Sequence, residues 1–267
     1  MYPFSGAWSL SHAGPMTRTV ADAALMLTVM AGPDDRDQSC LPDGPVDYVK
    51  RLKGDLKGLR VAWSPALGDA AVDPEVQAVC AKAARRFKEF GCRLDAADPG
   101  WPSPHEAWET IFFGGVGARL APYLPDRRQD IEIGLVRIIE KVLTWPSTKY
   151  IQAWFDRLTF WDRARKFFAR YDLLLTPTVA CAPFKVGIDN PADVAGRAVH
   201  DYGWIPFTYP FNMTGQPAAS VPCGFTKDGL PIGLQIVGRR FDDATVLRAA
   251  ACFEQGQPWA QRRPPVG

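Results

Sequence analysis

Few residues in this sequence have the types and spacing that nucleophilic catalysis needs. A hydroxyl or thiol nucleophile requires a neighbouring base and backbone donors that receive the oxyanion. The sequence contains neither a Gly-x-Ser-x-Gly nor a Ser-x-x-Lys pattern. Ser147 and Lys149 are close in sequence, but a serine at a helix start ordinarily caps the helix. Ser220 lies within an apolar run, without the exposed turn that a nucleophile requires.

The thiols and imidazoles offer two further pairings. Cys181 with His200, or Cys223 with His12, would form a dyad only if the fold brought the two side chains together. The six cysteines have no Cys-x-x-Cys spacing, and the three histidines are isolated from one another. We therefore expect reduced, structural thiols, no metal site and no cofactor.

The most structured stretch is 204–238. Two apolar runs, 218–222 and 232–237, flank the turn signal Asp228-Gly229 and predict a β-hairpin. Pro210, Gly215 and Pro217 interrupt the chain before the first run, which predicts an aromatic-rich loop rather than a regular helix.

The remaining elements alternate strands with helices. Helices are expected after Thr19, from Asp73 to Phe90, after Ser103, after Asp126 and from Ser147 or Thr148 to Arg170. A further helix near the end of the chain is expected to begin at Asp242. Strands 59–63 and 92–96 predict a parallel βαβ unit, and 173–176 predicts a buried strand. The glycines at 114, 115 and 117 favour close helix packing, and 103–171 forms a largely helical region.

The structure of segment 190–201 and the orientation of the long helix depend on tertiary contacts. Segment 190–201 could be a mobile helix or lid. In the long helix, we expect Tyr150, Trp154, Leu158 and their apolar neighbours to face the core. Its arginines, Arg157 among them, are expected on the solvent face.

Composition limits the classes of function. The chain has 267 residues, 47% of them hydrophobic, and we expect a single domain over 1–267 with a buried core. The 31 basic residues nearly balance 29 acidic ones, which gives no reason to expect nucleic acid or membrane partners. Neither a signal peptide nor a membrane span is seen, so a cytoplasmic location is expected.

Three stretches resemble one enzyme family. They are Gly14-Pro-Met-Thr-Arg18 with the following helix, Tyr171-Asp-Leu-Leu-Leu-Thr-Pro-Thr178, and the two halves of the predicted hairpin, Phe211–Gly224 and Asp228–Gly238. In this order they resemble the amidase-signature hydrolases. The resemblance implies an α/β fold with a mixed β-sheet surrounded by helices. It also implies catalysis by a serine, a second serine in a cis peptide and a lysine. The family has these residues before the Gly-Pro-Met-Thr-Arg stretch, so we expect them to lie upstream of this chain.

The resemblance also implies which residues shape the substrate pocket. These are Thr176, Thr178, Ile205, Phe207, Tyr209 and Asn212. A loop-stabilising role for Asn212 and a packing role for the aromatic residues are alternatives. The tRNA-dependent amidotransferases of the family have an acidic residue, which recognises the amine of glutamine, at the position of Ile205. Because isoleucine cannot pair with an ammonium group, a neutral or apolar amide is the expected substrate.

Two hypotheses follow for the function. In the first, the chain is the C-terminal segment of an amide C–N hydrolase, shapes the pocket and acts on a small-molecule amide once the catalytic half is present. In the second, it is a non-catalytic remnant or subunit that associates with itself or a partner chain through an exposed sheet edge.

Overall fold

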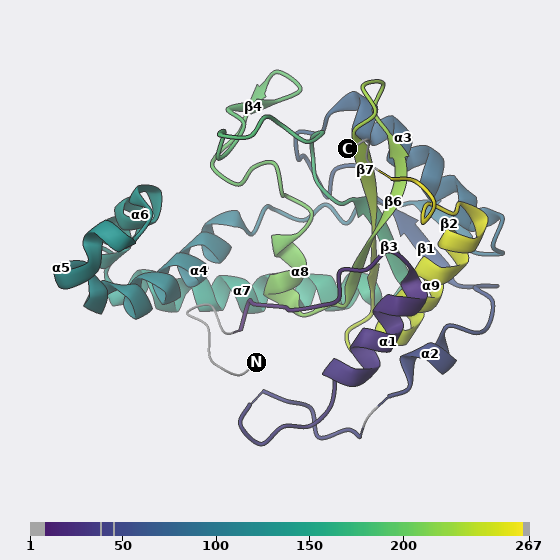
Figure 1. Ribbon diagram of the computed structural model, residues 1–267, viewed down its shortest axis with the longest axis horizontal. Helices are drawn as coiled ribbons and strands as arrows, with labels where there is room; N and C mark the ends of the chain where they lie inside the picture. The colour runs from purple at the N-terminus through teal and green to yellow at the C-terminus, as the bar shows by residue number, and fades with distance from the viewer. Residues whose placement is uncertain (1–8, 38, 45, 264–267) are drawn as a thin grey trace.

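A five-stranded sheet forms the centre of the molecule (Figure 1). The computed structural model describes residues 9–37, 39–44 and 46–263. The strand order is β2-β1-β3-β7-β6, with β1 (Arg60–Trp63), β2 (Arg93–Ala96), β3 (Leu173–Pro177), β6 (Ala218–Phe225) and β7 (Pro231–Gly238). β1 is parallel to β2 and β3, whereas β7 is antiparallel to β3 and β6. The predicted mixed sheet is confirmed.

Helices cover both faces of this sheet. One face packs against α1 (Val20–Met30), α3 (Pro74–Arg85) and α9 (Asp243–Gly256), and the other against α4 (His105–Leu120), α7 (Ser147–Phe168) and α8 (Tyr209–Thr214). β3 separates the two cores because successive strand side chains point to opposite faces. Leu173 and Leu175 pack in the core beneath α1, α3 and α9, and Leu174 packs in the core beneath α4, α7 and α8. Burial on both faces explains why β3 is a continuous apolar run.

The predicted hairpin is present as β6 and β7. Its turn contains Gly229 at φ 80, a left-handed conformation that glycine adopts without steric cost. The Thr226 amide donates to the Leu230 carbonyl at 2.8 Å and closes the loop. Among the described residues β6 pairs only with β7, so one backbone edge of the sheet is free of a partner strand.

Side-chain caps determine where several helices begin. The Thr19 hydroxyl accepts from the Asp22 amide, the Asp73 carboxylate from the Glu75 and Val76 amides, and Asp242 from the Thr245 amide. These three caps satisfy amides that would otherwise lack an intrahelical acceptor. The βαβ unit of β1, α3 and β2 follows as predicted, and the short helix α2 (Tyr48–Arg51) precedes it.

Helices α4, α5 (Leu124–Arg127), α6 (Ile133–Leu143) and α7 form the helical region (Figure 1). A Cβ on Gly117 would lie 2.2 Å from Val142 Cγ2, and one on Gly114 would lie 3.0 Å from Tyr150. These glycines therefore permit the close helix approach that the sequence predicted. No helix in the described parts of the chain has both the length and the apolarity to cross a bilayer.

Segment 190–201 is not a helix, so that alternative is wrong, whereas the lid stays a prediction. It forms a small hairpin of β4 (Asp193–Val194) and β5 (Arg197–Ala198). Its turn contains Ala195 at φ 54 and Gly196 at φ 75. Two successive left-handed residues make a tight hairpin turn and cannot continue a right-handed helix.

Three other expectations also need correction. The aromatic segment contains α8, because Pro210 lies in its first turn, where no amide donor is needed. Ser147 begins α7 but makes no side-chain cap. Leu158, expected in the core, is 59% exposed, because Ala153, Phe160 and Ala164 make up the buried face of α7.

Candidate functional site

A hollow of about 950 Å³ lies along the free edge of the sheet and is here called the β6 hollow. Residues 12–20 form one side of it, and β6 with the end of β3 forms another. Its polar and charged lining residues come from separate elements and include Arg18, Thr178, Thr208, Asn212, Gln216, Ser220, Gln235, Asp243 and Arg262. Hydrogen-bonding groups around apolar walls are the usual composition of a ligand site.

Thr178 and Ser220 lie next to each other in the β6 hollow. Their hydroxyl oxygens are 2.7 Å apart. Gly233 lies close behind them, since a Cβ at that position would come within 2.7 Å of Ser220 Oγ and 2.8 Å of Thr178 Oγ1. The partner of Ser220 is thus another hydroxyl rather than a base, and this arrangement does not activate a nucleophile.

Gln235 connects the end of β3 to the aromatic segment. Its side-chain amide donates to Thr176 Oγ1 at 3.0 Å and to the Phe207 carbonyl at 2.8 Å. Thr176 and Phe207 are fully buried, and Thr176 also donates to the Pro177 carbonyl. These two predicted pocket residues therefore lie in the protein interior, behind the residues that line the β6 hollow.

Gln216 carries an unpaired polar atom at the β6 hollow. The side chain is 6% exposed, and among the described residues its Oε1 has no hydrogen-bond partner. A buried oxygen without a donor is costly, and native proteins satisfy the great majority of such atoms. The residue lines the hollow, and its oxygen is a buried acceptor without a donor among the described residues.

Arg157 and Asn212 link the start of the described chain to α8 through hydrogen bonds. The Arg157 guanidinium donates to the Met213 carbonyl at 2.7 Å, to Ser9 Oγ at 2.7 Å and to the Ser9 carbonyl at 2.9 Å. Asn212 donates from Nδ2 to the Leu10 carbonyl at 2.8 Å. The expectation that Arg157 faces solvent is wrong, because this guanidinium is partly buried between the two segments.

Ile205, Tyr209 and Asn212 line a neighbouring hollow of about 300 Å³, together with residues 10–13, Trp108 and Phe112. Asn212 also borders the β6 hollow. The Tyr209 ring stacks on Trp108 with centroids 5.0 Å apart, and its hydroxyl is 3.1 Å from Ser103 Oγ. Burial raises the pKa of Tyr209, so it remains a neutral phenol. Four of the six predicted residues, these three and Thr178, thus border two adjacent hollows.

The alternative nucleophiles are not paired with bases. Among the described residues, no hydrogen bond links Cys181 to His200 or Cys223 to His12. Burial raises the pKa of the Cys181 thiol, which disfavours the thiolate. Cys223 Sγ instead lies 3.8 Å from Cys80 Sγ. The Lys149 ammonium lies over the Trp145 ring at 4.2 Å, a cation–π contact in place of a pairing with Ser147.

No cluster of three or more His, Cys, Asp or Glu side chains in the described residues could hold a metal ion. Sequence reasoning missed Arg157 and Gln216. The pattern of α7 gave no signal for Arg157, since its partners are main-chain groups and a serine far away in sequence. Gln216 stands between Gly215 and Pro217, which indicated a turn and nothing about a pocket.

Comparison with known proteins agrees with this architecture. The Amidase family model matches residues 4–247. An acylamidase of Rhodococcus erythropolis is 41% identical over 96% of this chain. One glutamyl-tRNA(Gln) amidotransferase subunit, from Brevibacillus brevis, is 34% identical over 97% of it. The chain spans about half of each, 54% and 57% of their lengths.

A solved structure shares the fold. A bacterial aryl acylamidase of the amidase-signature enzymes superposes with a TM-score of 0.86 at 33% identity, over 93% of this chain and 53% of that one. The family match, the two relatives and the shared mixed sheet all lead to one assignment. The chain belongs to the amidase family, among its amidase-signature members.

Proposed function

We propose that this chain is the C-terminal segment of an amide C–N hydrolase and forms the wall of its substrate pocket. In this proposal the serine nucleophile, the cis-peptide serine and the lysine are supplied by sequence upstream of the chain. The reaction is acylation of the serine by an amide, loss of ammonia or an amine, and hydrolysis of the acyl-enzyme by water.

The β6 hollow is the observation that carries this proposal. It lies along a strand edge without a partner among the described residues, and its lining includes Gln216, whose buried Oε1 has no donor among those residues. A catalytic segment placed there would pair with the β6 backbone and could donate to Gln216. The Thr178–Ser220 hydroxyl pair would then border the reacting group rather than supply it.

The expected substrate is a neutral or apolar amide. Ile205 lines the 300 Å³ hollow with Trp108 and Phe112, and no carboxylate belongs to the described lining of that hollow. Desolvation of an ammonium group beside these side chains would be unfavourable. An acyl or aryl group would instead bury apolar surface there.

A second candidate function is a non-catalytic subunit that binds a partner chain. The observation in its favour is the apolar outer surface of α1, where Val29 is 81% exposed and Leu25 is 55% exposed, with Met26 and Met30 nearby. The free edge of β6 could also receive a strand from another chain. In this proposal the partner carries the catalytic half.

Hydrolysis of simple aryl and alkyl amides by the purified chain tests the first proposal. We expect no turnover. Turnover that is abolished by replacing Ser147, Ser220 or Cys181 would overturn it, because the nucleophile would then lie within this chain.

Solution behaviour tests the second candidate. An assembly larger than a monomer, or binding of a hydrophobic dye, is expected if α1 and β6 are uncovered interaction surfaces. A monodisperse monomer that binds no dye, measured by light scattering and dye fluorescence, would count against it.

A further inference from the structure

A third hollow is lined almost entirely by residues that do not border the two already described. It has a volume of about 250 Å³ and is here called the flap hollow, because residues 197–200 of the β4–β5 segment form one of its walls. No residue that lines it also lines the β6 hollow, and it shares only Tyr209 with the 300 Å³ hollow.

The flap hollow lies where parallel α/β sheets ordinarily hold ligands. Residues 66–71 follow the carboxyl end of β1, and residues 101–104 follow that of β2. β1 lies between β2 and β3, and the connections that leave β1 and β2 cross on opposite faces, through α3 and through α4 to α7. Ligands of open α/β sheets bind outside the carboxyl ends of strands at such a reversal.

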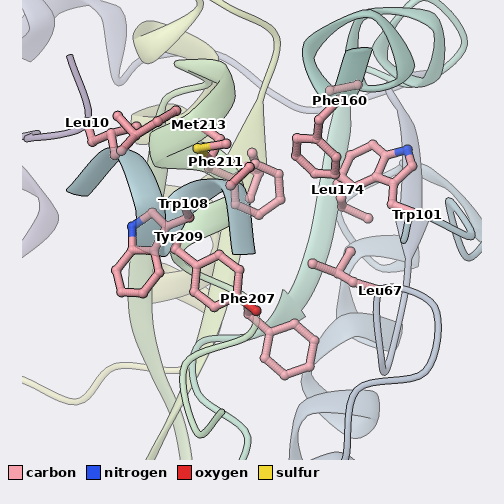
Figure 2. Close-up of a cluster of buried hydrophobic side chains, with 14 of the residues drawn as sticks. Leu10, Leu67, Trp101, Trp108, Phe160, Leu174, Phe207, Tyr209, Phe211 and Met213 are labelled. Carbon is pink, nitrogen blue, oxygen red and sulfur yellow. The ribbon is translucent and has the colours of Figure 1, made fainter. Parts of the chain in front are cut away.

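The inner wall of the flap hollow is aromatic. Trp101 meets Phe160 edge to face, with ring centroids 5.3 Å apart at 75°. Leu67 and Tyr209 add further apolar surface, and all four side chains are buried. Figure 2 shows Leu67, Trp101 and Phe160 around Leu174 of β3, with Tyr209 across from them. Rigid aromatic walls favour a flat ring, through stacking and edge contacts.

The formal charges of the residues at the mouth of the flap hollow are balanced. Arg197 Nη2 donates to the main-chain carbonyl of Asp69 at 3.0 Å, and the lining of the hollow includes both residues, one basic and one acidic. His200 Nδ1 is 2.6 Å from the Asp201 carbonyl, and because a carbonyl oxygen only accepts, this nitrogen is the donor. Donors and acceptors are both present, without an excess of either charge.

We propose that the flap hollow binds a small, uncharged aromatic molecule that carries one hydrogen-bond donor and one acceptor. The ring lies against Trp101 and Phe160, the acceptor receives a hydrogen bond from Arg197, and the donor faces Asp69 or His200. An anionic or a cationic head group would meet one unlike and one like charge and would lose its hydration without a net gain.

Three probes of nearly equal shape test this assignment by calorimetry: benzamide, benzoate and benzamidinium. We expect benzamide to bind with a dissociation constant of about 1–10 mM. The two charged probes should bind about fivefold more weakly. No benzamide binding in this range, or a charged probe that binds as well as benzamide, would overturn the proposal.

Variants locate the binding and test the charge argument. Ala70→Phe fills the hollow and should abolish benzamide binding, with the circular dichroism spectrum as a check on folding. Asp69→Asn leaves the mouth with a net positive charge and should raise benzoate affinity about threefold. The matched control is Asp126→Asn on exposed α5. Undiminished binding by folded Ala70→Phe, or equal responses of the two Asp→Asn variants, would overturn the proposal. Binding is measured without turnover, so the result is independent of amide hydrolysis.

Discussion

Replacement of Arg157 by alanine should destabilise the folded chain. The guanidinium makes three charge-assisted hydrogen bonds, two to main-chain carbonyls and one to Ser9 Oγ. It also lies 4.9 Å from the Trp154 ring centroid. The acceptors belong to two segments distant in sequence, so the substitution removes the link between the start of the described chain, α7 and α8.

The magnitude follows from these contacts. A hydrogen bond to a charged group contributes about 1.5–3 kcal/mol, but the three cannot be summed, because a buried guanidinium loses hydration and exposed acceptors regain water. We expect Arg157→Ala to lower the free energy of unfolding by about 3 kcal/mol. Arg157→Lys should lower it by about 1–2 kcal/mol, since an ammonium cannot reproduce the planar fork of donors.

Urea unfolding, followed by tryptophan fluorescence and circular dichroism, measures both changes. The matched control is Arg163→Ala on the exposed face of the same helix, which should change the free energy of unfolding by less than about 0.5 kcal/mol. If Arg157→Ala and Arg163→Ala proved equally stable, the buried link would make no contribution and the reasoning would be refuted.

Three further predictions concern other parts of the structure. Gly117→Ala should lower the free energy of unfolding by about 1–3 kcal/mol, because its Cβ would lie 2.2 Å from Val142 Cγ2; adding Val142→Ala should restore part of the loss, and a purely additive double variant would contradict this. Burial lowers the pKa of His105, so the neutral form is favoured on folding, and stability present above pH 6.5 should fall as the pH drops toward 5. His105→Gln should flatten that pH dependence of the thermal midpoint, and an unchanged slope would exclude this origin. Cys80 and Cys223 should react with a thiol reagent only under denaturing conditions, since both are buried and the pKa of Cys80 is raised by its hydrogen bond with Cys223; rapid labelling of either in the native chain would show that the site opens.

Local sequence signals predicted much of the fold. The caps at Thr19, Asp73 and Asp242, the turn at Asp228-Gly229 and the apolar run of β3 depend on neighbouring residues, and each was predicted correctly. The hairpin at 190–201 and the exposure of Leu158 were not predicted. The hairpin depends on two residues in the left-handed conformation, and the exposure of Leu158 depends on which face of α7 packs against the sheet.

The candidate site was less predictable, because its geometry arises from contacts between distant segments. The role of Arg157 depends on Ser9, nearly 150 residues earlier, and the position of Gln235 depends on Thr176 and Phe207. Family resemblance identified the segments that border the hollows but could not separate Thr178 at the surface from Thr176 in the interior. Only the tertiary contacts make that distinction.

Complementation of amide hydrolysis tests the central claim most directly. The chain would be assayed on an aryl amide alone, and again after mixing with a separately produced N-terminal half of the Rhodococcus erythropolis acylamidase. We predict no hydrolysis by the chain alone and turnover in the mixture that disappears when the serine nucleophile of the added half is replaced. Hydrolysis by the chain alone, at a rate unaffected by the added half, would contradict the claim.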